Sequence, residues 1–411
     1  MSEIWPSTKV RDCCDILDNL RVPINAEERT DIQGNIPYYG ANGLQGYIDK
    51  FIFDEPLILL AEDGGYFDEY ESRPIAYRIR GKSWVNNHAH ILRTKVGGSF
   101  SQDFVFYCLE HKNLMPFIKG GTRAKLNQAE LREILIQKPP EPIQRRIAQI
   151  LSTVDEAIEQ TEALIAKYQQ IKDGLMHDLF TRGVTSDGYL RPTRAQATHL
   201  YRESPLGWIP KEWEVMPLDE HVRIIDCKHY TPAFQTEGFP FIRPRNVKVD
   251  GLDLQGVDYV SAEDFQTLTD VYQPCHGDIV FSRNASFGVP CYIDTDLQFA
   301  IGQDCVIMAA KASDTRFVFC ALTNSITAAQ IAKVSAGSTF GRINLGEIRK
   351  LLIPHPGKEE EQRIAARFFA CTNLSRKLID ELAKLRQQKH GLMHDLLTGR
   401  VRVKVGESAS A

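Results

Sequence analysis

The chain has 411 residues, of which 43% are hydrophobic and 25% are charged, so its composition is that of a globular protein with about two or three domains. The net charge of −4 by itself predicts neither nucleic-acid binding nor membrane binding. No apolar run approaches the roughly 18 residues of a membrane span, and no signal-peptide pattern opens the chain, so we expect a cytoplasmic protein.

Cysteine spacing gives no sign of a metal or disulfide framework. The nine cysteines include no Cys-x-x-Cys pair, which predicts reduced thiols. Cys275, His276 and Cys291 could contribute metal ligands, but structural sites usually present their ligands as closely spaced pairs. We therefore expect no metal site.

The first 138 residues form a predicted mixed α/β module with an uneven charge distribution. Residues 1–71 carry 5 basic and 15 acidic side chains, whereas residues 72–138 carry 12 basic and 4 acidic ones. This pattern could produce a basic face, but we favour the simpler interpretation that both stretches interleave in one domain and cancel. Strand-like runs at 51–60 and 75–80 alternate with turns.

A long helix is predicted over residues 139–182. It starts at Pro139 and Pro140, and apolar or small residues then recur with alternating spacings of four and three before Gly183. Such a seam needs a partner. We expect a second copy of the same segment, packed antiparallel, and an intermolecular dimer is the alternative. The predicted residues of the helix-pair interface are Ile147, Val154, Leu164, Ile171, Leu175, Ile364, Leu374, Leu378, Leu385 and Leu392.

The second copy lies 217 residues further along the chain. Residues 121–184 align without a gap to residues 338–401, and about a third of the aligned positions are identical. Both copies contain Gly-Leu-Met-His-Asp-Leu, beginning at Gly174 and Gly391. The chain is therefore a tandem duplication, with a variable module before each long helix.

The remaining boundaries follow from this repeat. We predict a polar, turn-rich linker at 183–204, a second module at 205–355, a second long helix at 356–398 and a tail at 399–411. The modules share little sequence but keep an order of features. Residues 36–39 correspond to 239–242, 57–64 to 278–284, and 104–108 to 317–320. We expect one fold that carries two different surfaces, with further strand-like runs at 279–282 and 305–309.

Catalytic motifs are not apparent. Residues 80–83 resemble the end of a phosphate-binding loop, but Ala76 stands where that motif needs its first glycine. Glu62-Asp63 and the repeated His-Asp pairs at 177–178 and 394–395 could serve acid–base chemistry, yet structural roles are the simpler interpretation. The sequence contains neither an adenine-methyltransferase box nor a convincing nuclease cluster, so we expect no catalytic residue.

The sequence offers binding chemistry instead. A glycine loop with hydroxyl and basic groups precedes each helix segment, at 119–125 and 337–342, and such loops suit phosphate oxygens. Arg, Asn and Gln near turns or aromatic residues could contact base edges. The candidate DNA-binding residues of the first module are Tyr39, Asn42, Arg73, Arg78, Lys82, Asn86, Asn87, His88, Lys119, Thr122, Arg123 and Lys125. Those of the second are Lys228, Arg243, Arg245, Asn246, Arg283, Asn284, Gln303, Ser338, Thr339 and Arg342.

Over essentially its whole length the chain resembles the specificity subunit of type I restriction–modification enzymes. The resemblance rests on the repeat, the two loops before the helices, the Arg-Ile-Ala helix starts, the paired helix ends and the segment 207–215. One departure is the first helix start, which reads Ile-Gln-Arg-Arg-Ile at 143–147, whereas 360–364 read Glu-Glu-Gln-Arg-Ile.

The resemblance implies a non-catalytic subunit that recognises double-stranded DNA. Its α+β fold would contain two similar mixed α/β target recognition domains, each followed by a long helix, with the helices packed as an antiparallel coiled coil of pseudo-two-fold symmetry. Each domain would bind half of a split, asymmetric target, and the helix pair would set the gap.

The resemblance also implies partners. Two modification subunits would methylate adenine N6 with S-adenosylmethionine, and two restriction subunits that use ATP and Mg could join, with no cofactor in this chain and no membrane. Alternatives are a specificity subunit whose partner fuses cleavage and methylation, a single-chain DNA-acting enzyme, and a coiled-coil scaffold without DNA. The scaffold would show no salt-dependent DNA binding.

Overall fold

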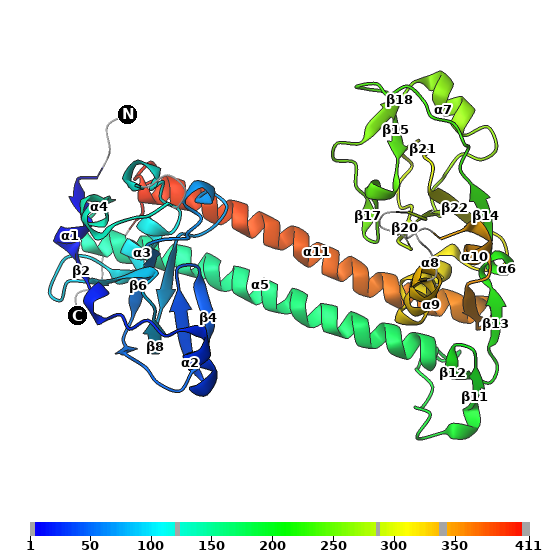
Figure 1. Cartoon of the computed structure of the whole chain (residues 1–411), viewed down its shortest axis with the longest axis horizontal. Helices are drawn as coiled ribbons and strands as arrows, with labels where there is room; N and C mark the ends of the chain where they lie inside the picture. The colour runs from blue at the N-terminus through cyan, green and yellow to red at the C-terminus, as the bar shows by residue number, and fades with distance from the viewer. Residues whose placement is uncertain (1–4, 120–123, 285–287, 337–342, 405–411) are drawn as a thin grey trace. The chain divides into compact units, whose positions relative to one another are not determined.

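The computed structural model describes residues 5–119, 124–284, 288–336 and 343–404, and the chain divides into two compact units. The first unit comprises Met1–Ala163 and Asp380–Ala411, and the second comprises Leu164–Ile379. Each unit therefore holds one module, the start of one long helix and the end of the other (Figure 1). The predicted fold of two mixed α/β modules, each followed by a long helix, is confirmed.

The first module contains two four-stranded sheets. The sheet β2-β9-β6-β7 is antiparallel, and in the sheet β4-β3-β8-β5 the strands β3 and β8 are parallel. Helix α3 packs on the first of these sheets. The strands are β1 (Ser7–Lys9), β2 (Cys14–Ile16), β3 (Ile36–Gly40), β4 (Gly43–Ile48), β5 (Phe53–Asp54), β6 (Leu57–Ala61), β7 (Ala76–Ile79), β8 (Lys82–Val85), β9 (Ala89–Thr94) and β10 (Leu135–Gln137). The helices are α1 (Val10–Cys13), α2 (Ala26–Asp31), α3 (Gln102–Glu110) and α4 (Gln128–Glu133).

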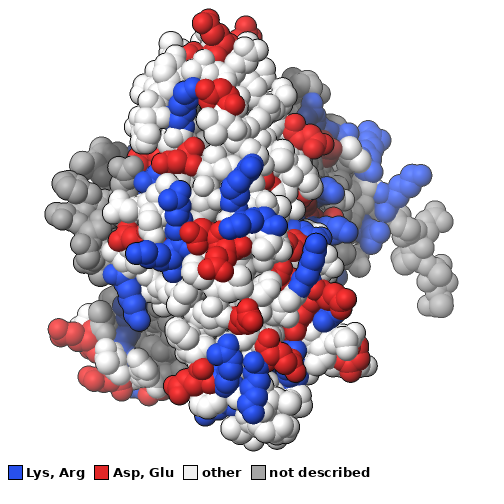
Figure 2. Space-filling model, turned by 90° about the vertical axis from the view of Figure 1, so that its right-hand side faces the viewer, with Lys and Arg blue, Asp and Glu red and all other residues white. Residues whose placement is uncertain are grey.

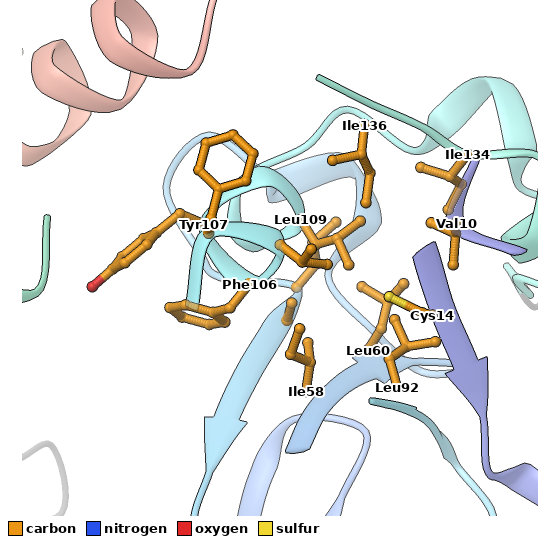
Figure 3. Packing of buried hydrophobic residues seen from close by; sticks show 14 of the residues in the cluster. Val10, Cys14, Ile58, Leu60, Leu92, Phe106, Tyr107, Leu109, Ile134 and Ile136 are labelled. Atoms are coloured by element: carbon orange, nitrogen blue, oxygen red, sulfur yellow. The ribbon is translucent and has the colours of Figure 1, made fainter. Parts of the chain in front are cut away.

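Strand β6 lies inside the first sheet, and its continuous apolar sequence suits that position. All five of its residues are buried, because both faces of the sheet are covered. Ile58 and Leu60 belong to the apolar cluster that includes α3 (Figure 3). Leu57 and Leu59 belong to a second cluster, on the other face of the sheet. A strand covered on both faces has a continuous apolar sequence rather than an alternating one.

The second module repeats this topology. Its antiparallel sheet β14-β22-β19-β20 matches β2-β9-β6-β7, and β15 pairs in parallel with β21 as β3 pairs with β8. The strands are β11 (Tyr201–Ser204), β12 (Gly207–Pro210), β13 (Glu214–Pro217), β14 (Val222–Asp226), β15 (Phe239–Ile242), β16 (Val247–Lys248), β17 (Gly251–Leu252), β18 (Asp258–Val260), β19 (Ile279–Ser282), β20 (Pro290–Tyr292), β21 (Ala300–Ile301), β22 (Cys305–Ala310) and β23 (Leu352–His355). The helices are α6 (Leu218–His221), α7 (Ala262–Leu268), α8 (Thr315–Thr323), α9 (Ser325–Ala336) and α10 (Leu345–Arg349).

Each unit combines the two long helices in opposite directions. These are α5 (Glu141–Thr181) and α11 (Lys358–Leu397). In the first unit, Ile147 near the start of α5 shares an apolar cluster with Leu396 at the end of α11. In the second unit, Phe180 at the end of α5 shares one with Ile364 near the start of α11. Because both helices are continuous, the pair is antiparallel, as predicted.

The predicted seam residues are covered to different degrees along these helices. Ile147 and Ile364 are buried. The half-buried residues are Val154, Leu175, Leu378, Leu385 and Leu392. Three others keep 40–44% of their surface exposed, namely Leu164, Ile171 and Leu374.

The polar segment predicted as a linker packs tightly on the second unit. Val184 and Arg191 are buried in it, and both contact the carboxylate of Glu360 in the first turn of α11. All nine cysteines are free thiols in the structure. Among the described helices, none alone has both the length and the apolar composition to cross a membrane; α8 and α9 reach that criterion only together, across a 67° bend.

Candidate nucleic-acid interface

The described flanks of the first glycine loop lie beside the end of strand β6. The backbone N–H of Leu126 donates to the carbonyl of Glu62 (2.8 Å), and Lys125 forms β-bridges with Asp63 and Lys119. The described flanks of the loop thus meet beside the residues that follow β6. Thr122 and Arg123 lie outside the described residues.

Two turns of the module lie at this same end of the sheet. Asn42, in the turn between β3 and β4, donates from Nδ2 to the carbonyl of Gly64 (3.0 Å). Nδ1 of His88, in the turn between β8 and β9, lies 2.7 Å from Oδ1 of Asp63, and the exposed Asn87 precedes it. We call this group the first loop surface, and its members are Asn42, Asp63, Asn87, His88, Lys119 and Lys125.

The second unit assembles the equivalent segments in the same way. Ile343, at the position of Leu126 in the repeat, donates its N–H to the carbonyl of Arg283 (3.0 Å) at the end of β19. Gly302 donates to the carbonyl of Ile242 (2.8 Å) and so places the turn before β22 beside the end of β15. We call this group the second loop surface, and its members are Arg243, Arg245, Asn284, Gln303 and Asp304. Ser338, Thr339 and Arg342 lie outside the described residues.

The two loop surfaces share a backbone arrangement but differ in chemistry. Hydrogen-bond register places Gln303 at the position of Asn87 and Asp304 at the position of His88. The contact between Asp63 and His88 is replaced by one between Asn284 and Asp304 (3.2 Å). Equivalent positions therefore present different hydrogen-bonding groups.

Asp304 marks the second loop surface as conformationally unusual. Its φ of 70° is the one positive value among the described non-glycine residues. Aspartate tolerates this left-handed conformation better than most residues, and such strain is concentrated at functional sites. The exposed Gln303 precedes Asp304 and takes its direction from this turn.

Buried ionic networks support both loop surfaces. In the first unit Asp18 accepts from Nδ1 of His90 (2.6 Å), whose Nε2 lies 2.8 Å from the carbonyl of Leu126. Burial raises the pKa of Asp18, but the hydrogen bond and charge of His90 outweigh it and hold that pKa below its ordinary value. Glu62 is bound by Arg21 and by Lys125 (3.1 Å). The sequence did not single out Asp18, His90 or Arg21.

The second unit has a buried ionic network at the equivalent place, but the residue that follows the strand carries the opposite charge. Arg283 follows β19 as Glu62 follows β6, and its buried guanidinium pairs with Asp226 (2.8 Å) at the end of β14. Strand register places Asp226 at the position of Asp18. An aspartate thus stands at equivalent places near the ends of β2 and β14, outside the duplicated segments 121–184 and 338–401.

Several other candidates have roles inside the modules. Asn86 and Asn246 are buried and bonded to their own turns, through the amide of His88 (2.8 Å) and the carbonyl of Asp253 (2.9 Å) respectively. Arg78 is held by Asp103 (3.0 Å). Half-buried Tyr39 has its pKa raised by burial.

Three exposed or partly exposed cations lie elsewhere or are already paired. Arg73 pairs with Glu69 (2.9 Å) and lies outside the turns and loop flanks that form the first loop surface. Lys82 begins β8, at the opposite end of that strand from Asn87, with its Nζ 4.7 Å from the centre of the Phe51 ring. Lys228 follows β14 and pairs with Asp270.

Charges are mixed on the described surfaces. The acidic and basic stretches of the first module interleave, as we favoured: Arg93 pairs with Glu55 (3.3 Å) and Asp15 (3.4 Å), and Lys125 with Glu62. Figure 2 shows basic and acidic side chains alternating over one face of the second unit. The net charge of a module therefore does not locate its interface.

Two groups among the described residues bring potential metal ligands close together. One is Asp18, Glu62 and His90, where Arg21 already supplies the counter-charge. The other is His221, His355 and Glu361, which Ser313 completes: its hydroxyl lies 2.8 Å from both Nδ1 of His221 and Oε1 of Glu361. Burial and the charge of His355 lower the pKa of His221 to about 4. Arg21 and Ser313 supply ion-pair and hydrogen-bond partners in these groups, whereas Nε2 of His221 has no hydrogen-bond partner among the described residues. Cys275, His276 and Cys291 form no such group.

Comparison with known proteins gives a consistent result. The chain matches the family described as the type I restriction modification DNA specificity domain twice, over residues 3–170 and 210–384. It is 27% identical to a putative type I restriction enzyme specificity subunit of Haemophilus influenzae, over 88% of this chain and 87% of that one. It is 25% identical to a type I restriction enzyme specificity subunit of Methanocaldococcus jannaschii, over 98% and 94%. Its fold is similar to the crystal structure of a type I restriction–modification S subunit from M. genitalium, with a TM-score of 0.68, 15% identity and 96% coverage of each chain.

Proposed function

Because the chain belongs to the family of type I restriction–modification DNA specificity subunits, we propose that it recognises a bipartite, asymmetric DNA target, one half through each loop surface. The supporting observation is that the same segments gather at the same end of both sheets but carry different side chains. Two equivalent scaffolds with different donors and acceptors suit two different half-sites.

The loop surfaces supply two kinds of contact in this proposal. Lys119, Lys125 and the glycine loops would bind phosphates and set the register on the duplex. Exposed planar groups would contact base edges in the major groove: Asn87 and Asn42 in one half-site, Gln303 and Arg245 in the other. Each well-placed base contact discriminates against a wrong base by about 1–3 kcal/mol.

The division of labour follows from the repeat. Residues 1–138 and 205–355 would be the recognition domains, and α5 with α11 would be a spacer that fixes the gap between half-sites. The helices would also dock two modification subunits, which methylate adenine N6 with S-adenosylmethionine, and ATP-dependent restriction subunits could join. In this arrangement the chemistry resides in the partner subunits.

The decisive experiment is a genome-wide map of N6-methyladenine in the host, with the gene present, deleted and restored. Loss of one split, gapped motif on deletion, and its return on restoration, is the expected result. An unchanged map, in a strain where a modification subunit copurifies with the chain, would contradict the proposal.

The spacer role has its own test. Four residues inserted into α5 and four into the facing part of α11 lengthen an antiparallel pair by about 6 Å, close to two base pairs. The methylated motif should then acquire a longer gap with unchanged half-sites. An unchanged gap in a chain that still directs methylation would refute the spacer.

A further inference from the structure

A cluster of buried charges joins the first module to both long helices. Nζ of Lys389, in α11, lies 2.7 Å from Oε1 of Glu110 at the end of α3, and 2.7 Å from Oδ1 of Asp155 in α5. Asp155 also accepts from the hydroxyl of Tyr107 (2.6 Å) and lies 3.6 Å from the guanidinium of Arg78 on β7. We call these five residues the ionic joint. Figure 3 shows the hydroxyl of Tyr107 turned away from the apolar cluster to which its ring belongs.

The joint is largely shielded from water, and Lys389 is the counter-charge of Glu110 within it. Side-chain exposure is 9% for Glu110, 13% for Lys389, 15% for Asp155 and 19% for Arg78. Among the described residues, Lys389 is the one hydrogen-bond partner of the Glu110 side chain, since Oε2 of Glu110 has none. Burial raises the pKa of Glu110, and the charge of Lys389 opposes that rise.

The duplication provides a control for what the fold requires. Lys389 corresponds to Lys172 in the first copy of the repeat, and Asp155 corresponds to Thr372 in the second. In the second unit Nζ of Lys172 lies 5.3 Å from the centre of the Phe368 ring, within an aromatic cluster. The same position in the same fold is thus filled by aromatic packing, so the fold itself does not require the ionic joint.

Beside the ionic joint, the interface between the first module and the long helices is not continuously packed with apolar side chains. A crevice of about 790 Å³ runs along it, lined by polar and charged residues such as Glu71, Glu159 and Arg386 as well as by Tyr77 and Ile158. Apolar contacts are non-directional, whereas paired charges and hydrogen bonds fix distance and angle. Buried ion pairs are weak evidence for stability but can specify one arrangement among several.

We propose that the ionic joint is a positioning device that fixes the first recognition domain on the helix pair, and that Lys389 is its central positioning residue. This inference rests on the proposed function, in which the spacer sets the gap between half-sites. A displacement of the domain by about 3.4 Å, the rise of one base pair, would be enough to admit a target whose gap is wrong by one.

The test is a methylation map of cells that carry Lys389→Met in the full-length chain, with its natural partner subunits. Cells with the wild-type chain should methylate only sites that have one gap length. The variant should also methylate sites whose gap is one base pair longer or shorter, raising their methylated fraction at least tenfold, while the half-sites stay the same. Lys172→Met is the matched control in the second unit and should leave the gap as strict as in wild type.

A triple variant separates positioning from folding. Lys389→Met with Glu110→Gln and Asp155→Asn leaves no unpaired buried charge, so it should restore any loss of assembly while keeping the relaxed gap. The proposal is overturned if the triple variant retains strict gap selection, if Lys172→Met relaxes the gap equally, or if an assembled triple variant methylates no site. A wild type without a gapped motif would instead refute the proposed function.

Discussion

Replacing Arg191 with Met should release the segment between the two halves of the chain from the second unit. The guanidinium of Arg191 donates to Oε2 of Glu360 (2.9 Å), and the two side chains are only 10% and 7% exposed. Without it, Glu360 keeps the amide of Val184 (2.7 Å) and the indole of Trp213 (3.3 Å), but no buried counter-charge. Breaking a buried pair costs about 3–5 kcal/mol, and the retained bonds place the expected cost near the lower end.

The assay is hydrogen exchange of the full-length chain, resolved by peptide over residues 184–204. A local cost of about 3 kcal/mol corresponds to roughly a hundredfold loss of protection. Arg194→Met is the matched control, because that arginine stacks on Trp208 at the surface (4.3 Å to the ring centre), where the contribution is about 0.5–1 kcal/mol. Arg191→Met with Glu360→Gln should recover most of the protection. A threefold loss or less in the single variant, or no recovery in the double, would refute the reasoning.

Three further predictions concern the loop surfaces and one buried histidine. Lys125→Ala should weaken binding to all DNA sequences and lower the salt slope by about one, whereas Lys82→Ala, at the far end of β8, should not; equal slopes in a salt titration would contradict the phosphate assignment. Gln303→Ala should reduce the discrimination between bases at one position of one half-site by about tenfold to a hundredfold, and Asn87→Ala should do so in the other half-site. Methylation mapping measures both, and a loss of discrimination in the same half-site for both variants would contradict the assignment. Because the folded-state pKa of His221 is about 4 and its ordinary value is 6.5, the unfolded chain protonates first as the pH falls. Stability should therefore drop between pH 6.5 and 4, by up to about 3 kcal/mol, and urea unfolding of His221→Asn should show a smaller drop.

The sequence predicted the limits of the long helices well, because residues that start or end helices stand on both sides of each one. Prolines precede each helix and a glycine follows, so predicted limits of 139–182 and 356–398 fall within two residues of α5 and α11. The strand-like run at 51–60 was less well resolved. It is two strands, β5 and β6, separated by Glu55 and Pro56, and proline cannot donate to a ladder.

The candidate interface was only partly predictable, because the type of a residue does not determine whether it is buried. Arg283 and Gln303 are both planar donors beside a turn, yet Arg283 is buried against Asp226 and Gln303 is exposed. The supporting network was out of reach, since Asp18 and His90 meet across 72 positions of sequence. The repeat predicted glycine loops at equivalent places. Their described flanks at Leu126 and Ile343 do occupy equivalent places, whereas residues 120–123 and 337–342 lie outside the described residues.

The two compact units differ in how their residues are ordered along the chain, and this affects their assembly during synthesis. The second unit is one uninterrupted stretch, Leu164–Ile379, and can fold as soon as that stretch leaves the ribosome. The first unit needs residues from both ends of the chain, since Lys389, Met393 and Leu396 complete a core whose other members were made more than 200 residues earlier. A prematurely terminated chain would hold a finished second recognition module and an unfinished first one. Completion of the core of the first unit thus requires synthesis of the end of α11.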